Sequence, residues 1–183
     1  MNILLSTDDI KRLATDFNLS VAMIKSVLIV ESSGQGFDAA TGKIKIQFEA
    51  QWFERFEKTK ILNGVESQKK EWEAYEKAYA ISPESAMKAT SWGLGQVMGF
   101  NHKQAGYDSV SAMVKEFKMS EYYQLRGMLK FISSNNAMFR ALQAQNWGQF
   151  AYWYNGPKYR QFNYDVRLAD AYLKVKESFK NVA

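Results

Sequence analysis

Glu31 is the residue whose type and spacing best suit acid–base chemistry. It follows Leu28 by three positions and Val27 by four, so on a helix its carboxyl lies on the apolar face. Residues 32–36, SSGQG, are expected to end that helix beside a flexible loop. Burial raises the pKa of a carboxyl, and a general acid that cleaves a glycosidic bond must keep its proton near neutral pH. A glutamate that caps a loop amide or pairs with a lysine would have the same spacing.

Glu49 is the second candidate carboxylate. The alternation of apolar and polar residues over 43–49 places its side chain on the polar face of a short strand, with two lysines and a glutamine. There it could border a cleft and remain ionised, and either stabilise positive charge that develops on a sugar or activate a water. A solvated glutamate at a strand end explains the same pattern.

Two glycines mark a third candidate segment. Residues 91–99 read SWGLGQVMG, with Gly93 and Gly95 inside a segment that is otherwise typical of a helix. Such glycines often allow close approach of a backbone or a ligand, to which Gln96 could offer its amide. Tight packing of two helices through small residues is the alternative.

An aromatic segment ending in a turn is the fourth candidate. Residues 152–157 read YWYNGP, in which Asn155-Gly156 favours positive φ and Pro157 prevents the helix from continuing. Aromatic faces can stack on sugar rings, and a tyrosine hydroxyl and an asparagine amide can hydrogen-bond to them. A helix C-cap with core aromatics is the better explanation when the segment is taken alone.

The composition narrows the chemistry to carboxylates. The 183 residues include no cysteine, which excludes disulfides, thiolate nucleophiles and Cys-ligated zinc or iron–sulfur clusters. The single histidine, His102, lies in a polar stretch without an evident Ser or Asp partner and is interpreted as a surface residue. Neither a phosphate-binding loop nor a dinucleotide fingerprint occurs. We therefore expect no metal and no organic cofactor.

The charge balance favours an anionic partner. The 24 Lys and Arg against 19 Asp and Glu give a net charge of +5, which suits nucleic acid, a membrane surface or a cell wall. Basic residues are interspersed with acidic ones, which argues against nucleic acid. No run approaches the roughly 18 apolar residues of a membrane span, and no signal-peptide core follows the N-terminus. We expect a monomer that is made in the cytoplasm and does not insert stably into membranes.

Apolar spacing predicts a mostly helical chain with one short strand. Helices are expected at residues 7–17, 21–31, 52–56, 72–79, from 82–83 onward, and at 109–117, 120–133, 137–144, 147–154 and 164–180. Ile44, Ile46 and Phe48 alternate with polar residues and predict a half-buried strand in a small hairpin or sheet. Residues 63–70 are the best candidate for a loop or linker. The fold class is thus mainly α with a small β element, in one domain over residues 1–183.

The combined motifs resemble the N-acetylmuramidase domain family found in phage endolysins and related bacterial proteins. The resemblance spans roughly residues 20–175 and rests on VESSGQGF at 30–37, IQFE at 46–49, SWG at 91–93, MGFN at 98–101 and the segment 150–157. The order of the ESS, GLGQVM and YNGP segments is also similar to goose-type lysozymes and soluble lytic transglycosylases. Gly95 and Gly156 depart from the transglycosylase pattern.

The resemblance implies a lysozyme-like α+β fold and cleavage of the β-1,4 bond between N-acetylmuramic acid and N-acetylglucosamine in peptidoglycan. It implies that Glu31 is the catalytic acid and that Gln96, Tyr154 and Asn155 line the glycan groove. Ser91, in a matching segment, is a further candidate for substrate binding. Glu49 also lies in a matching segment, and its role as second catalytic carboxylate is our inference.

Two rival functions remain at this stage. A lytic transglycosylase would use the sugar's own 6-hydroxyl and leave a 1,6-anhydro product, and a wall-binding module would keep the groove without turnover. A carboxyl on an apolar face argues against a pure binder. A phage endolysin, a prophage remnant and an exported bacterial toxin all fit, and we expect no room for a separate wall-binding domain. Retention and inversion at the anomeric carbon both remain open.

Overall fold

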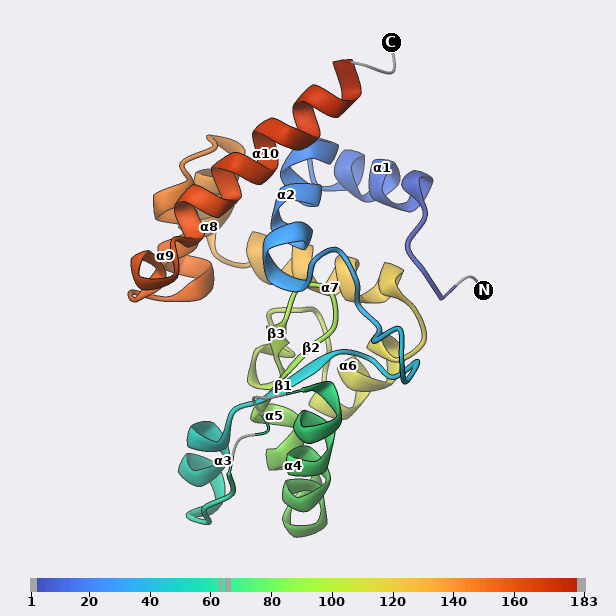
Figure 1. Ribbon diagram of the computed structural model, residues 1–183, viewed down its shortest axis with the longest axis vertical. Helices are drawn as coiled ribbons and strands as arrows, with labels where there is room; N and C mark the ends of the chain where they lie inside the picture. Colours follow the sequence, from blue (N-terminus) through green and yellow to red (C-terminus); the bar gives the residue numbers. More distant parts are fainter. Residues whose placement is uncertain (1–2, 63, 65–66, 181–183) are drawn as a thin grey trace. The chain divides into compact units, whose positions relative to one another are not determined.

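The computed structural model describes residues 3–62, 64 and 67–180, which are mostly helical (Figure 1). The α-helices are α1 (Thr7–Asp16), α2 (Val21–Ser32), α3 (Ala50–Glu57), α4 (Gln68–Ile81), α5 (Pro83–Lys88), α6 (Val110–Phe117), α7 (Glu121–Ser133), α8 (Asn136–Gln143), α9 (Trp147–Asn155) and α10 (Tyr164–Lys180). Short 3-10 helices are η1 (Gly99–Asn101) and η2 (Tyr159–Phe162). The strands β1 (Ile46–Phe48), β2 (Thr90–Trp92) and β3 (Val97–Met98) form one antiparallel sheet in the order β1-β2-β3. The predicted fold class, mainly α with a small sheet, is confirmed.

The chain divides into two compact units. Unit 1 comprises residues 1–4 and 35–131, and unit 2 comprises residues 5–34 and 132–183. Neither unit is one continuous stretch of chain, because the segment 35–131 is inserted between the two parts of unit 2. The expectation of one domain over residues 1–183 therefore stays a prediction.

Helix α2 forms the centre of unit 2. Ser20 caps its start by accepting a hydrogen bond from the Met23 amide, and Ile24 and Val27 are fully buried. Helix α10 packs along α2 and contributes the buried Leu168. Ser33 adopts left-handed φ of 57° and ends α2, while the Gly34 amide donates to the Leu28 carbonyl at 2.9 Å. The helix therefore ends one residue after Glu31, as its spacing predicted.

Helix α4 covers the free edge of the sheet in unit 1. The Gln68 side chain accepts from the Ile46 amide at 2.9 Å and donates to the Ile46 carbonyl at 2.8 Å. The buried Glu71 accepts from the Phe48 amide at 2.7 Å. These side chains replace a neighbouring strand and leave no open edge at β1. One turn further along α4, Tyr75 packs on Trp92, with ring centres 5.4 Å apart.

Two sequence-based expectations about unit 1 are wrong. Gly93 and Gly95 do not lie in a helix, because residues 93–96 form the turn of a hairpin between β2 and β3. The strands have three and two residues and are almost wholly buried, so they show no alternation of polar and apolar residues. The predicted loop 63–70 also ends early, because Ser67 caps α4 and the helix begins at Gln68. Residues 63, 65 and 66 of that loop lie outside the described residues.

Gly93 is required both for its conformation and for its lack of a side chain. Its φ is +66°, and a Cβ there would overlap the side-chain amide of Gln124. That amide accepts from the Leu94 amide and donates to the Phe117 carbonyl, both at 2.8 Å, so it cannot move without losing two buried hydrogen bonds.

We expect Gly93→Ala to lower the free energy of unfolding by about 2–4 kcal/mol, through backbone strain and overpacking together. Gly42→Ala is the matched control, because Gly42 has φ of +67° and open space where a Cβ would be. It should lose only about 1 kcal/mol. Urea denaturation measures both changes, and equal losses would contradict the assigned overlap with Gln124.

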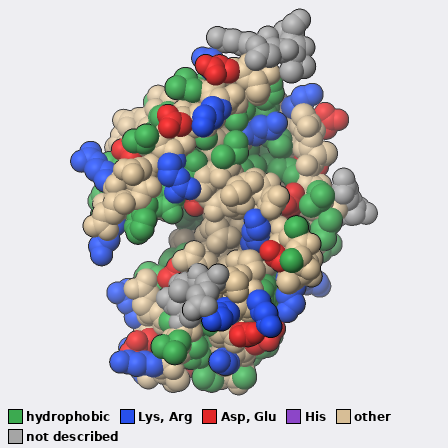
Figure 2. All heavy atoms as spheres, in the orientation of Figure 1, with side chains coloured by type: hydrophobic (Ala, Val, Ile, Leu, Met, Phe, Trp, Pro, Cys, Tyr) green, Lys and Arg blue, Asp and Glu red, His purple; other side chains and the backbone are tan. Residues whose placement is uncertain are grey.

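Both signs of charge occur on one face of the molecular surface (Figure 2). On the face drawn in Figure 2, Lys and Arg side chains are distributed with Asp and Glu side chains among them. Within residues 3–62, 64 and 67–180, no single helix is long and apolar enough to cross a membrane. Helices α1 and α2 meet the length and composition criteria only together, and they are bent by 115°.

Candidate active site

The carboxyl of Glu31 meets an amide from a distant part of unit 2. Glu31 lies in the last turn of α2, and Asn155 is the last residue of α9. Asn155 Nδ2 donates a hydrogen bond of 2.9 Å to Glu31 Oε1 across 124 positions of sequence. Helix α9 ends at Asn155, the residue that makes this contact, and Gly156 follows it with φ of +88°. The positive φ expected at the Asn-Gly pair is therefore confirmed at Gly156.

Burial raises the pKa of Glu31 to about 7. Its side chain keeps partial exposure, but the apolar face of α2 removes much of the water that would stabilise the charged form. The Asn155 hydrogen bond and the positive charge of Arg167 both act in the opposite direction and lower the pKa. The result is a carboxyl that holds its proton about half of the time at neutral pH, which suits a general acid.

Helix α10 supplies two residues that the sequence did not reveal as part of the site. Arg167 Nη2 donates to the Val30 carbonyl at 3.0 Å, next to Glu31 in α2. The guanidinium carbon lies 5.1 Å from the ring centre of Tyr164, whose pKa is raised by burial and by Glu31. Tyr164 and Arg167 are three residues apart, so both lie on one face of α10. Only the packing of α10 on α2 shows that this face meets Glu31.

Tyr154 and Asn155 lie next to each other at the end of α9, close to Glu31. Burial and the nearby Glu31 raise the pKa of Tyr154 well above its usual value, so its hydroxyl stays protonated. Its ring stacks on Phe150 with centres 5.3 Å apart. Asn155 Oδ1 is buried and has no hydrogen-bond partner among the described residues, so a donor from a ligand or a water would satisfy it.

Glu49 lies in unit 1, where it follows β1 and precedes α3. Gln47 Nε2 donates to Glu49 Oε1 at 2.8 Å. Burial raises the pKa of Glu49, while hydrogen bonds from Gln51 and Gln47 lower it. The carboxyl is thus half-buried and held by two amides rather than being a freely solvated strand-end group.

Ser91 and Gln96 contact each other across the β2–β3 hairpin. Ser91 Oγ donates to Gln96 Oε1 at 2.8 Å, and Gln96 Nε2 donates to the Gly93 carbonyl at 2.8 Å. Both Gln96 groups therefore help to hold the turn, in which Gln96 itself has φ of +46°. A Cβ at Gly95 would lie 2.5 Å from Met128 Cγ, so these glycines allow the hairpin to pack on α7.

The candidate residues thus form one group in each unit. Glu31, Tyr154 and Asn155 come together in unit 2. In unit 1, Gln47 links the other candidates, because its side chain contacts Glu49 and its carbonyl accepts a 3.4 Å hydrogen bond from Ser91. Gln47 was not singled out in the sequence, although its place on the polar face of the strand beside Glu49 was an available signal.

His102 and the possible metal ligands are the remaining candidates for chemistry. His102 contacts the Gly99 carbonyl through Nδ1 at 3.1 Å, consistent with a structural position. Throughout the part of the chain that the structure describes, no three His, Asp or Glu side chains are grouped to hold a metal ion.

Comparisons with known proteins identify a family and a similar solved structure. A family model described as N-acetylmuramidase matches residues 20–176. The crystal structure of a Burkholderia AP3 phage endolysin is similar, with a TM-score of 0.84 and 30% sequence identity over 97% of this chain and 73% of that chain. Comparison with curated protein sequences gives no match.

Proposed function

The chain belongs to the N-acetylmuramidase family, and on this premise we propose that Glu31 is the general acid with which it cleaves peptidoglycan. The enzyme is a lysozyme-type glycoside hydrolase that acts on the β-1,4 bond between N-acetylmuramic acid and N-acetylglucosamine. The assignment of Glu31 rests on its position in the last turn of a buried helix, where burial raises its pKa to about 7.

In the proposed mechanism, protonated Glu31 gives its proton to the glycosidic oxygen. The bond from that oxygen to the anomeric carbon breaks, and its electron pair leaves with the oxygen while an oxocarbenium-like charge develops on the muramic acid ring. Asn155 and Arg167 stabilise the carboxylate that remains on Glu31, because both favour its charged form. A water then adds to the anomeric carbon and loses one proton to a base.

Glu49 is proposed as the second carboxylate, which would position that water or stabilise the sugar cation. Burial raises the pKa of Glu49, and the amides of Gln51 and Gln47 oppose this by favouring the ionised form that the role requires. Tyr154 and Asn155 are proposed to bind the glycan through a hydroxyl donor and an unpartnered amide oxygen. Ser91 and Gln96 are proposed to bind it as well, although their side chains also hold the hairpin.

We propose that the protein is an endolysin. The similarity to a phage endolysin over nearly the whole chain supports this setting. The protein would act as a monomer on the cell wall, without binding nucleic acid or inserting into the membrane, and a separate membrane pore would let it reach the wall.

The products of cleavage test the reaction. Purified sacculi are digested in isotopically labelled water, and the released fragments are analysed by mass spectrometry. We expect reducing-end muramic acid that carries one labelled oxygen, because hydrolysis adds one water to each bond that is broken. Unlabelled 1,6-anhydro ends would instead assign the protein as a transglycosylase, and intact sacculi with a folded protein would leave wall binding as its function.

A further inference from the structure

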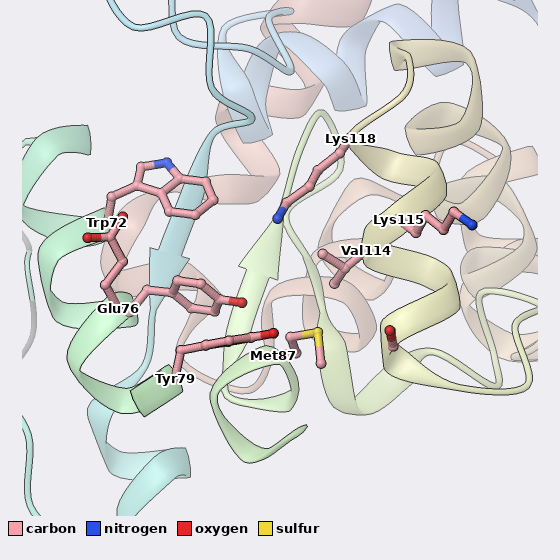
Figure 3. Close-up of a pocket in the computed structure, with 9 residues that line it drawn as sticks. Trp72, Glu76, Tyr79, Met87, Val114, Lys115 and Lys118 are labelled. Carbon is pink, nitrogen blue, oxygen red and sulfur yellow. The ribbon is translucent and has the colours of Figure 1, made fainter. Parts of the chain in front are cut away.

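An aromatic pocket with a lysine at its edge lies in unit 1, and none of the candidate site residues lines it. The pocket has a volume of about 560 Å³ and lies between α4 and α6. Figure 3 shows Trp72 and Tyr79 projecting from α4 on one side and Val114 from α6 on the other, with Met87 between them. This volume is typical of a site for a small ligand.

A second pocket, of about 330 Å³, shares Trp72 and Lys118 with the first. It is lined in addition by Lys43 and by the apolar side chains of Phe37 and Ile44. The indole of Trp72 is fixed in place, because its Nε1 donates to the Ile44 carbonyl at 3.2 Å. The two pockets therefore offer a rigid aromatic wall with space for a short extended ligand along both.

No carboxylate of the described residues neutralises the charge of Lys118. Its Nζ lies 5.6 Å from the ring centre of Trp72 and 5.8 Å from that of Trp92, and no carboxylate of the described residues lies within 4.0 Å of it. Lys43 lies 4.8 Å from the same Trp72 ring and pairs with Glu76 at 3.4 Å. Burial and the charge of Lys43 both lower the pKa of Lys118, and no anionic group among the described residues acts in the opposite direction. An anion beside Lys118 would provide one.

The chemistry of the lining selects among anions. An ammonium beside aromatic rings suits a carboxylate attached to methyl groups and flat amide planes, which pack on such rings. Sites for phosphate more often use arginine or the N-terminus of a helix, whereas Lys118 follows the C-terminal end of α6. Short peptides that carry carboxylates are attached to the muramic acid residues of peptidoglycan.

We propose that this pocket binds the carboxylate-bearing peptide of peptidoglycan, with Lys118 contacting the carboxylate and Trp72 and Tyr79 contacting the peptide. The proposal rests on the assignment of peptidoglycan as the substrate. It adds a site that recognises the peptide rather than the sugar chain. The enzyme would then bind peptide-bearing wall more tightly than bare glycan.

Titration of the intact protein with a synthetic wall pentapeptide tests the pocket. The shifts of the tryptophan indole NMR signals report binding, and the same peptide with an amidated C-terminus reports the contribution of that carboxylate. Because a hydrogen bond to a charged group contributes about 1.5 kcal/mol or more, we expect Lys118→Gln to weaken binding about tenfold. Tyr79→Ala, at a side chain that is 44% exposed, should also weaken binding without loss of folding.

Lys115→Gln is the matched control. Lys115 lies one turn before Lys118, and its replacement by glutamine removes the same charge. Figure 3 shows the ammonium of Lys115 directed away from Lys118. The affinity of this variant should stay within about twofold of the wild type, since the Lys115 ammonium points away from the group that we propose to contact the carboxylate (Figure 3). Absence of saturable peptide binding, equal affinity of Lys118→Gln and wild type, or equal affinity for the free and amidated peptides would overturn the proposal. So would Lys118-dependent binding to vesicles of anionic lipid without binding to the peptide.

The pocket and the proposed catalytic function can fail separately. Cleavage of peptide-free glycan strands by the wild type depends on the catalytic groups alone, whereas the peptide titration involves no turnover. Cleavage of bare glycan without peptide binding would overturn only the pocket. Peptide binding without cleavage of any glycan would overturn only the proposed catalysis.

Discussion

Glu31→Gln is expected to lower kcat for peptidoglycan cleavage by about 10²–10⁴-fold, the usual contribution of a general acid. Glutamine keeps the size of the side chain and can still contact Asn155, but it has no proton to give to the leaving oxygen. The affinity for peptidoglycan should change little, because the missing interaction forms only as the glycosidic bond breaks. Release of soluble fragments from purified sacculi measures kcat, and co-sedimentation with sacculi measures affinity.

Glu177→Gln is the matched control for this variant. Glu177 lies in α10 of the same unit and is exposed, so the substitution removes the same charge from a position without catalytic geometry. It should keep wild-type activity. Activity of folded Glu31→Gln within about tenfold of the wild type would exclude Glu31 as the general acid, since a positioned acid contributes more than this.

The helices and the position of Glu31 could be predicted because local residue patterns determine them. Ser20 caps α2, the apolar positions define its buried face, and the small residues after Glu31 end the helix within one residue of the expected place. The burial of the carboxyl follows directly from its distance to Val27 and Leu28. A raised pKa was therefore predictable from sequence, and burial is indeed the largest cause of the shift.

The hairpin and the partners of Glu31 depend on packing between distant segments. Gly93 and Gly95 are typical of close approach, but only Gln124 and Met128 of α7 show what approaches them. Arg167 contacts the carbonyl of Val30 because α10 packs along α2, and no local pattern specifies that register. The family resemblance implied only that Asn155 lines a glycan groove. Its hydrogen bond to Glu31 could not be predicted without the fold.

The raised pKa of Glu31 predicts that both activity and stability fall as the pH rises through about 7. Above this value, each pH unit removes about nine-tenths of the remaining protonated acid, so kcat/KM should fall about tenfold per unit. Asn155→Ala removes a hydrogen bond that favours the charged form, and it should therefore move this decline to higher pH. Initial rates between pH 5 and 9 measure both effects.

The stability of the folded protein should also fall as the pH rises. The folded protein binds the Glu31 proton up to about pH 7, whereas the unfolded chain releases it near its ordinary pKa of 4.5, so the folded state holds more protons between these values. The stabilisation is therefore complete below about pH 4.5 and is lost as the pH rises to about 7, after which it no longer changes. Because the carboxyl keeps partial exposure, we expect a loss of about 1–3 kcal/mol rather than the full value of the shift.

Urea denaturation at pH 5 and pH 8 isolates the contribution of Glu31. Glutamine carries no charge at either pH, so Glu31→Gln should gain about 1–3 kcal/mol relative to the wild type on going from pH 5 to pH 8. Glu177→Gln is the control at both values, because this substitution is at an exposed position of the same unit. A difference between wild type and Glu31→Gln that is the same at both pH values would mean that the carboxyl is already ionised at pH 5, and such a group could not serve as the acid near neutrality.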